Sequence, residues 1–229
     1  MDDKTFSDLT IKAMICPKQA SWPAPEHSHW QRLHEAADTA RQSVSTAYSL
    51  MATIDADASL SKEGRAQHRQ TIAKQALAEI EKSKALIKAR DAVGVCQQQW
   101  AKKVGESIKP ASDIHTATVA AQIRDRIAAM QGSARMGWLE KHSSDPTIAS
   151  AILTAPLVLS GLTDVELALV KAKAERAALS PEVAEAKDAA EKALDQAERG
   201  WRQAINAIGA RAGLSKGADG TWSEAAHYD

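Results

Sequence analysis

The sequence predicts an all-α protein of long alanine-rich helices packed as an antiparallel bundle, with an extended C-terminal arm. Hydrophobic residues make up 44% of the 229 positions, and alanine supplies about half of them. The chain has one Phe and two Tyr, so aromatic residues that favour strands are scarce. The third observation is a stripe at spacings of four and three, formed by Val183, Lys187, Ala190, Leu194, Ala197, Trp201, Ala204 and Ile208.

Prolines organise the N-terminal part of the chain. Residues 5–15 can form a short helix, and the proline-containing stretch 17–25 breaks it and forces an extended link around Trp22. A second helix is predicted over residues 25–54, with proline in its first turn, where the missing N–H costs nothing. Residues 55–60 then form a loop.

The next helix is the longest that the pattern predicts, from Lys62 to about Lys103, with Ser61 as its N-cap. Unbroken, it would span ~60 Å. Gly94 is the residue at which an interruption is expected, and the pattern leaves open whether this stretch is one helix or two.

Caps and helix-breaking residues set the later helices. Ser112 or Asp113 begins a helix that Gly132 is predicted to stop, and two short helices follow before residue 154. Thr163 with Glu166 three positions later is a capping-box pattern that opens the penultimate helix.

The last predicted helix restarts at Ser180-Pro181-Glu182 and ends at Gly213. We therefore predict a short N-terminal helix with its link over residues 1–24, a helical bundle over 25–213, and an arm over 214–229. The arm has no core of its own, and deleting residues 215–229 is expected to leave the fold intact and abolish assembly.

Composition limits the function. Lysine plus arginine (29) balance aspartate plus glutamate (29), so charge favours neither nucleic acid nor an acidic membrane. No apolar run reaches the ~18 residues that a membrane span needs. The N-terminus lacks the apolar core of a signal peptide, and Cys16 and Cys96 are two distant single thiols. These features predict a soluble protein made in the cytoplasm.

The sequence offers no complete chemical site. It contains no nucleophile elbow, phosphate loop or dinucleotide fingerprint, which predicts a non-enzymatic protein without a cofactor or bound metal. Glu26–His29 and Glu224–His227 have the Glu-x-x-His spacing of di-iron helical proteins. Because those ligands must lie mid-helix, whereas one pair lies in a first turn and the other in the arm, chance placement is the favoured interpretation.

Large aromatic residues outside the predicted core are candidates for contacts with other proteins. Trp22 in the proline link, and Trp222 and Tyr228 in the arm, are the interface residues that the sequence predicts, since exposed aromatics make good interface anchors. Leu194, Trp201 and Ile208 are assigned instead to packing between helices.

Two segments carry a resemblance to a known class of protein. Residues 145–156 continue through Leu159-Ser160-Gly161-Leu162-Thr163 into long helices, and Leu60-Ser61-Lys62-Glu63-Gly64-Arg65 opens an alanine-rich helix. Both are similar to helical structural proteins of tailed bacteriophages. The resemblance implies a virion component present in many copies, which contacts itself and the portal, capsid or tail proteins and has no catalytic residues.

Three roles compete within that class, and two functions compete outside it. A scaffolding protein usually ends in a basic helical hook, which this chain lacks. A head-to-tail connector at the portal, with a C-terminal arm gripping its neighbour, is the leading hypothesis, and a decorating protein is close behind. The alternatives are a cytoplasmic helical adaptor or chaperone that binds a partner helix, and a ferritin-like di-iron protein.

Overall fold

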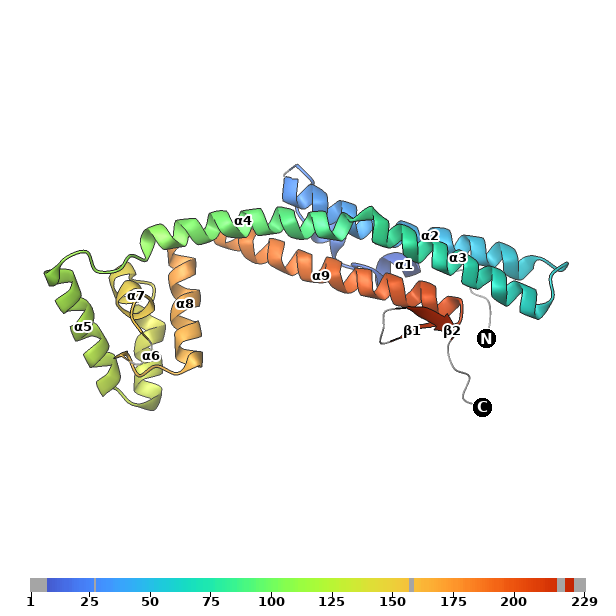
Figure 1. Ribbon diagram of the computed structural model, residues 1–229. Helices are drawn as coiled ribbons and strands as arrows, with labels where there is room; N and C mark the ends of the chain where they lie inside the picture. Colours follow the sequence, from blue (N-terminus) through green and yellow to red (C-terminus); the bar gives the residue numbers. More distant parts are fainter. Residues whose placement is uncertain (1–7, 27, 157–158, 218–220, 225–229) are drawn as a thin grey trace. The chain divides into compact units, whose positions relative to one another are not determined.

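The computed structural model describes residues 8–26, 28–156, 159–217 and 221–224, and these residues are almost entirely helical (Figure 1). The all-α prediction is therefore confirmed. The elements are α1 (Asp8–Met14), a 3-10 turn (Gln19–Ser21), α2 (Ser28–Ala56), α3 (Lys62–Ser83), α4 (Ala85–Ser107), α5 (Ile114–Ala129), α6 (Gly132–His142), α7 (Pro146–Leu153), α8 (Asp164–Ala178), α9 (Pro181–Arg211), β1 (Leu214–Lys216) and β2 (Trp222–Glu224).

The chain divides into two compact units rather than into the single bundle predicted for residues 25–213. Unit 1 comprises residues 1–94 and 189–229, and unit 2 comprises residues 95–188. The division falls inside α4 and α9, so each of these helices contributes to both units. No loop or change of composition accompanies this division, and the one sequence feature beside it is Gly94, where an interruption of the helix rather than a boundary between units was expected.

Unit 1 is built around α2, α3 and the second part of α9. A short loop over residues 57–61 reverses the chain between α2 and α3. The indole nitrogen of Trp201 donates to the carbonyl of Ala36 at 2.9 Å, and the Tyr48 hydroxyl donates to that of Ala207 at 3.2 Å. From the first of these hydrogen bonds to the second, the residue numbers increase in both helices, so α9 runs parallel to α2. Neighbouring helices are therefore not all antiparallel.

The C-terminal part of the predicted stripe of α9 contributes Trp201, Ala204 and Ile208 to this core. Five of the stripe's eight members are buried, and Val183, Lys187 and Leu194 are half-buried. Trp201 is 6% exposed and Ile208 is fully buried. The core against which they lie comes from α2 and α3, and includes Ala37, Ala40, Val44, Ala47, Met51, Ala73, Leu77 and Ile80. The assignment of Trp201 and Ile208 to helix packing is confirmed.

The interruption between residues 62 and 103 lies at Lys84, not at Gly94. Lys84 has a left-handed backbone (φ 53°), which ends α3 and begins α4, so the stretch is two helices. Gly94 is inside α4 with no heavy atom within 4 Å of the place of a Cβ. A helical glycine costs about 1 kcal/mol, and the buried side chains of Ala89 and Val93 on the same helix offset that cost.

Unit 2 packs α5 to α8 around Ile127, Leu139, Ile152 and Val170. The helix starts are those that the sequence predicts. Asp113 caps α5 by accepting from the Thr116 amide at 2.9 Å, and Thr163 caps α8 in a complete capping box. One predicted helix end is wrong, since α5 ends before Gly132, which instead begins α6.

A buried ion pair joins α6 to the start of α8. The Arg135 Nε lies 2.7 Å from Glu166 Oε1, and the two side chains are only 17% and 6% exposed. Glu166 Oε2 also accepts from the Thr163 amide at 2.8 Å and from its hydroxyl at 2.9 Å. Burial by itself raises the pKa of Glu166, but these hydrogen bonds outweigh it and hold the pKa below the ordinary 4.5.

The described part of the C-terminal segment is a hairpin that packs on α9, and not an extended arm. β1 and β2 pair antiparallel with Leu214 opposite Glu224. Leu214 is 5% exposed and belongs to the unit 1 core, with Trp222 packed against the same core. Glycine at 213 (φ 68°) supplies the left-handed turn that leads from α9 into β1.

Candidate functional site

Trp22, predicted to contact a neighbouring protein, makes its polar contact within its own chain. Its indole nitrogen donates to the Gln196 side chain at 3.1 Å. Its ring stands edge-on to the His34 imidazole, with 5.5 Å between ring centroids. The side chain is half-buried, so it fastens the segment after α1 to α9.

Trp222 likewise packs on its own chain, while Tyr228 lies outside the described residues. The Trp222 ring covers Gly209 of α9, and the Lys216 ammonium lies 5.9 Å from its centroid. A Cβ at Gly209 would stand 3.0 Å from Cη2 of that ring and closer still to Cζ3. The absence of a side chain at 209 is therefore what lets the hairpin sit on α9.

Replacing Gly209 with alanine is expected to release the hairpin without unfolding unit 1. The new methyl group collides with Trp222, whereas the change in helix propensity is favourable by about 1 kcal/mol. Hydrogen exchange at residues 214–216 and 222–224 should become roughly 10-fold faster or more. Gly94→Ala is the control, since it adds a methyl group in open space. Unchanged exchange in the Gly209 variant would contradict the close contact.

A polar cluster of unit 1 holds residue types found in catalytic sites. Arg41 donates to the backbone carbonyls of Ile15, at 2.9 Å, and Cys16, at 2.6 Å. It also donates to the side-chain oxygen of Gln19. The Gln19 amide nitrogen in turn lies 3.0 Å from an Asp38 carboxylate oxygen, and 3.1 Å from His34 Nδ1. Cysteine, histidine and aspartate thus gather where the first segment crosses α2.

The thiol in this cluster is unsuited to act as a nucleophile. Burial raises the pKa of Cys16 to about 11, despite the nearby Arg41 charge, so the thiol stays protonated near neutral pH. Its Sγ donates to the Gln196 carbonyl at 3.4 Å. Cys16 Sγ also lies close to Gly200, since a Cβ at that position would be 2.5 Å from the sulfur. The cluster therefore anchors the N-terminal segment on α2 and α9.

Thiol labelling at pH 8 is expected to separate the two cysteines. Cys96 is half-buried and should react readily, whereas Cys16 is 1% exposed and should react roughly 100-fold more slowly until the protein unfolds. Counting modified thiols by mass against time measures this. The Cys96→Ser variant should then show no fast phase, and a fast phase in that variant would mean that Cys16 is accessible.

The described residues give no support to a di-iron site. Glu26, His29 and Glu224 belong to no group of three His, Cys, Asp or Glu side chains close enough to hold a metal ion, and His227 lies outside the described part of the chain. Within the same described ranges, none of the helices combines the length and apolar character required to cross a bilayer.

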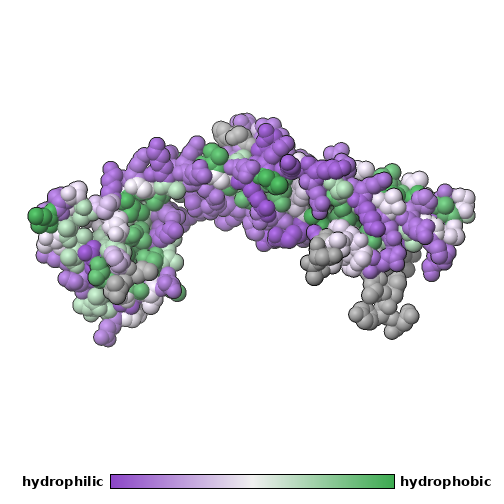
Figure 2. All heavy atoms as spheres, in the orientation of Figure 1, coloured by the Kyte–Doolittle hydropathy of each residue, from purple (hydrophilic) through white to green (hydrophobic). Residues whose placement is uncertain are grey.

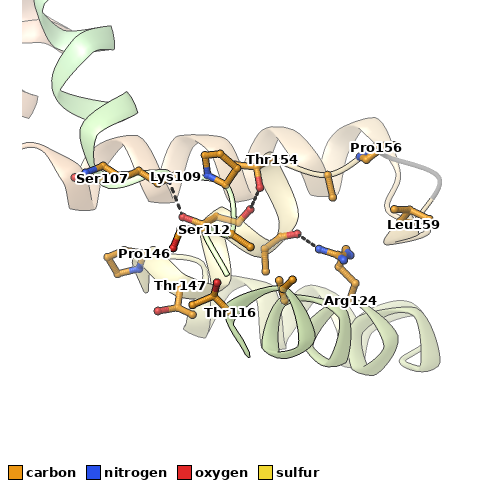
Figure 3. Close-up of a pocket in the computed structure, with 17 residues that line it drawn as sticks. Ser107, Lys109, Ser112, Thr116, Arg124, Pro146, Thr147, Thr154, Pro156 and Leu159 are labelled. Carbon is orange, nitrogen blue, oxygen red and sulfur yellow. Dashed lines mark hydrogen bonds between the residues drawn. The ribbon is translucent and has the colours of Figure 1, made fainter. Parts of the chain in front are cut away.

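Unit 2 carries an open groove between α5 and α7, with a volume of about 480 Å³ (Figure 3). Six hydroxyl side chains line it, together with alanines and prolines. Arg124 donates to the Ala151 carbonyl at 3.0 Å and ties α5 to α7, and the Lys109 amide donates to Ser150 Oγ at 3.2 Å. No carboxylate or imidazole is among the described lining residues, and the neighbouring Asp113 carboxylate, which accepts from the lining Ser112 Oγ at 3.3 Å, also caps α5.

The candidate functional site is a second groove, of about 460 Å³, on unit 1 between α2 and α3. It is called the α2–α3 groove below. Of its ten lining residues only Glu79 is charged. Leu50 stands half exposed on its wall. The lining comprises Thr39, Gln42, Ser43, Thr46, Ala47 and Leu50 from α2, and Ile72, Gln75, Ala76 and Glu79 from α3.

Sequence reasoning missed this groove, although a signal was present. Residues 42–54 contain no Asp, Glu, Lys or Arg in a chain that is 25% charged. One face of α2 enters the core, and an ordinary surface helix carries charges on the other. An uncharged outer face is typical of an interface core, where charged residues are depleted. The groove therefore has the character of a surface for an uncharged helix, and Glu79 is its one ionisable lining residue.

Comparisons of this chain with known protein families, with curated proteins and with solved structures found no match.

Proposed function

We propose that this chain is a non-enzymatic assembly protein that packs partner helices into its α2–α3 groove, as a structural component of a tailed-phage particle. The groove is the observation that carries the proposal. A helix that docks there buries Leu50 and Ile72 and meets a single charged residue, Glu79, which is already 3.7 Å from the Lys82 ammonium. Helix-in-groove recognition works through such a shape, with apolar anchors spaced along one helix face.

The phage assignment rests on the resemblance of residues 145–163 and 60–65 to helical virion proteins. The prediction that the chain lies at the junction of portal and tail was based on an extended C-terminal arm. The described part of that segment packs on α9 instead. The segment therefore does not favour the junction over other locations in the particle. The proposal is therefore a multi-copy structural protein, with portal, capsid or tail proteins as its partners.

The direct test is quantitative mass spectrometry of purified particles from the source of this sequence. The proposal expects several copies of the chain per particle. If the chain is absent from particles and instead forms a 1:1 complex with a host protein, the adaptor or chaperone function replaces it.

A charge placed in the groove tests whether that surface is responsible. Thr46 lines the groove and is exposed, so Thr46→Glu should leave the fold unchanged and prevent incorporation into particles. Gln67→Glu is the matched control, because Gln67 is exposed on α3 outside the groove. Equal incorporation of both variants would contradict the proposed use of the groove.

A further inference from the structure

We propose that the α2–α3 groove of one copy receives the first turns of α5 from a second copy, head to tail. This inference rests on the proposed function, since it names the partner surface through which copies of the chain assemble. It joins two features of the molecule that its own packing leaves uncovered, one on each unit.

The outer ridge of α5 is the second surface. Ile114, the first residue of α5, is 87% exposed, more than any other large hydrophobic residue described. Thr118 and Ala121 follow it at the fourth and seventh positions, so they share its face. Ile127, which is fully buried, lies on the opposite side of the helix. Figure 2 shows hydrophobic surface at the start of α5.

The two surfaces match in charge. Residues 114–123 contain no Asp, Glu, Lys or Arg, and neither do residues 42–54 of α2. Most of the surface in the view of Figure 2 is hydrophilic. Surfaces with so few charges disfavour a charged partner, because most ionised groups buried there would be unpaired. The ridge and the groove, whose one charged lining residue is Glu79, can therefore close on each other with little of that loss.

The two surfaces also match in size and shape. The groove follows α2 from Thr39 to Leu50, about 16 Å of helix, and the ridge from Ile114 to Ala121 covers about 10 Å. Ser43 and Ala76 are small lining residues, which leave room for a side chain of the size of Ile114. The remaining ridge positions, threonine and alanine, allow the helix backbones to approach closely.

This arrangement has a consequence for assembly. Each copy uses its groove for one neighbour and its ridge for another, so the contact is heterologous and continues into a ring or a chain. Pairing of two grooves about a twofold axis would instead stop at a dimer.

The experiment uses full-length Thr46→Glu, in which the groove is blocked, and full-length Ile114→Glu, in which the ridge is blocked. Both positions are exposed, and glutamate suits the first turn of a helix, so circular dichroism should show both variants folded. The added charges have the same sign, so the two blocked surfaces cannot pair with each other. Gln67→Glu is again the control.

Light scattering against concentration, up to about 100 µM, gives the mass of each sample. The wild type and Gln67→Glu should grow beyond dimers. Each blocked variant alone should stay monomeric, with association weakened about 100-fold by the buried charge. A 1:1 mixture of the two blocked variants should form a complex of two chains and nothing larger, because one intact groove and one intact ridge remain.

Three outcomes would overturn the inference. A mixture that stays monomeric shows that groove and ridge do not meet, and an Ile114→Glu variant that assembles like wild type shows that another surface fills the groove. The third is a wild-type chain that stays monomeric throughout. If Thr46→Glu is nevertheless excluded from particles in either of the last two cases, the groove binds a different particle protein and the proposed function stands.

Discussion

Replacing Trp201 with alanine is expected to lower the free energy of unfolding by about 3–5 kcal/mol, because it removes a buried tryptophan from the unit 1 core. Trp201 is 6% exposed, and its indole nitrogen donates to the Ala36 carbonyl at 2.9 Å. Several residues of this core are alanines, among them Ala37, Ala40 and Ala204, and alanine cannot extend to fill the space. Urea denaturation of the full chain, followed by circular dichroism, measures the loss.

Arg202→Ala is the control for that measurement. It changes the next residue of α9, which is exposed, and should alter the stability by less than about 0.5 kcal/mol. Hydrogen exchange should locate the effect of the Trp201 variant in unit 1. A loss below about 1 kcal/mol would mean that α9 is not packed on α2 as described.

Replacing Glu166 with glutamine is expected to destabilise unit 2 by about 3 kcal/mol at pH 7. The substitution keeps the shape and can preserve the capping box, since glutamine also serves at that position. What it removes is the negative charge 2.7 Å from Arg135, so that the largely buried guanidinium loses its ion partner. Hydrogen exchange in α6 and α8 should rise, while exchange in α2 stays unchanged.

The effect of this substitution should depend on pH in a defined direction. The folded-state pKa of Glu166 is below the ordinary 4.5, so the stabilisation is complete above pH 4.5 and is lost as pH falls through the folded pKa. The wild type and Glu166→Gln should therefore converge in stability on acidification. A difference that stays constant from pH 7 to pH 3 would contradict the ion pair.

A surface ion pair provides the matched comparison. Arg32 and Glu35 are also 2.7 Å apart, but their side chains are 43% and 42% exposed. Glu35→Gln should cost no more than about 1 kcal/mol, because water and salt screen an exposed pair.

Signals that act over a few residues could be read from the sequence. Ser61, Asp113 and Thr163 each accept from an amide three residues later, as the capping patterns predict. The same holds for the stripe of α9, since a 3.6-residue period puts its members on one face whatever the partner is. These features need no knowledge of distant residues.

Signals that depend on distant contacts were misread or missed. Glycine is needed at position 209 of α9 because the Trp222 ring lies where a Cβ would be. Glycine is needed at position 200 for the same reason, since Cys16 Sγ lies there. From the sequence alone, such a glycine indicates only a weak point in the helix. Lys84 adopts the left-handed conformation although lysine has no preference for it, so the break in the predicted long helix had no local sign.

The sequence by itself determined the helical class and most helix starts, because alanine content, capping residues and apolar period act within a turn or two of helix. Only the tertiary structure decided that the chain forms two units, that Trp22 and Trp222 pack on α9, and that α2 and α3 leave a groove with a single charged residue. Those features arise where residues far apart in the chain meet. The free energy of such contacts depends on which side chains become neighbours, and no local pattern specifies that.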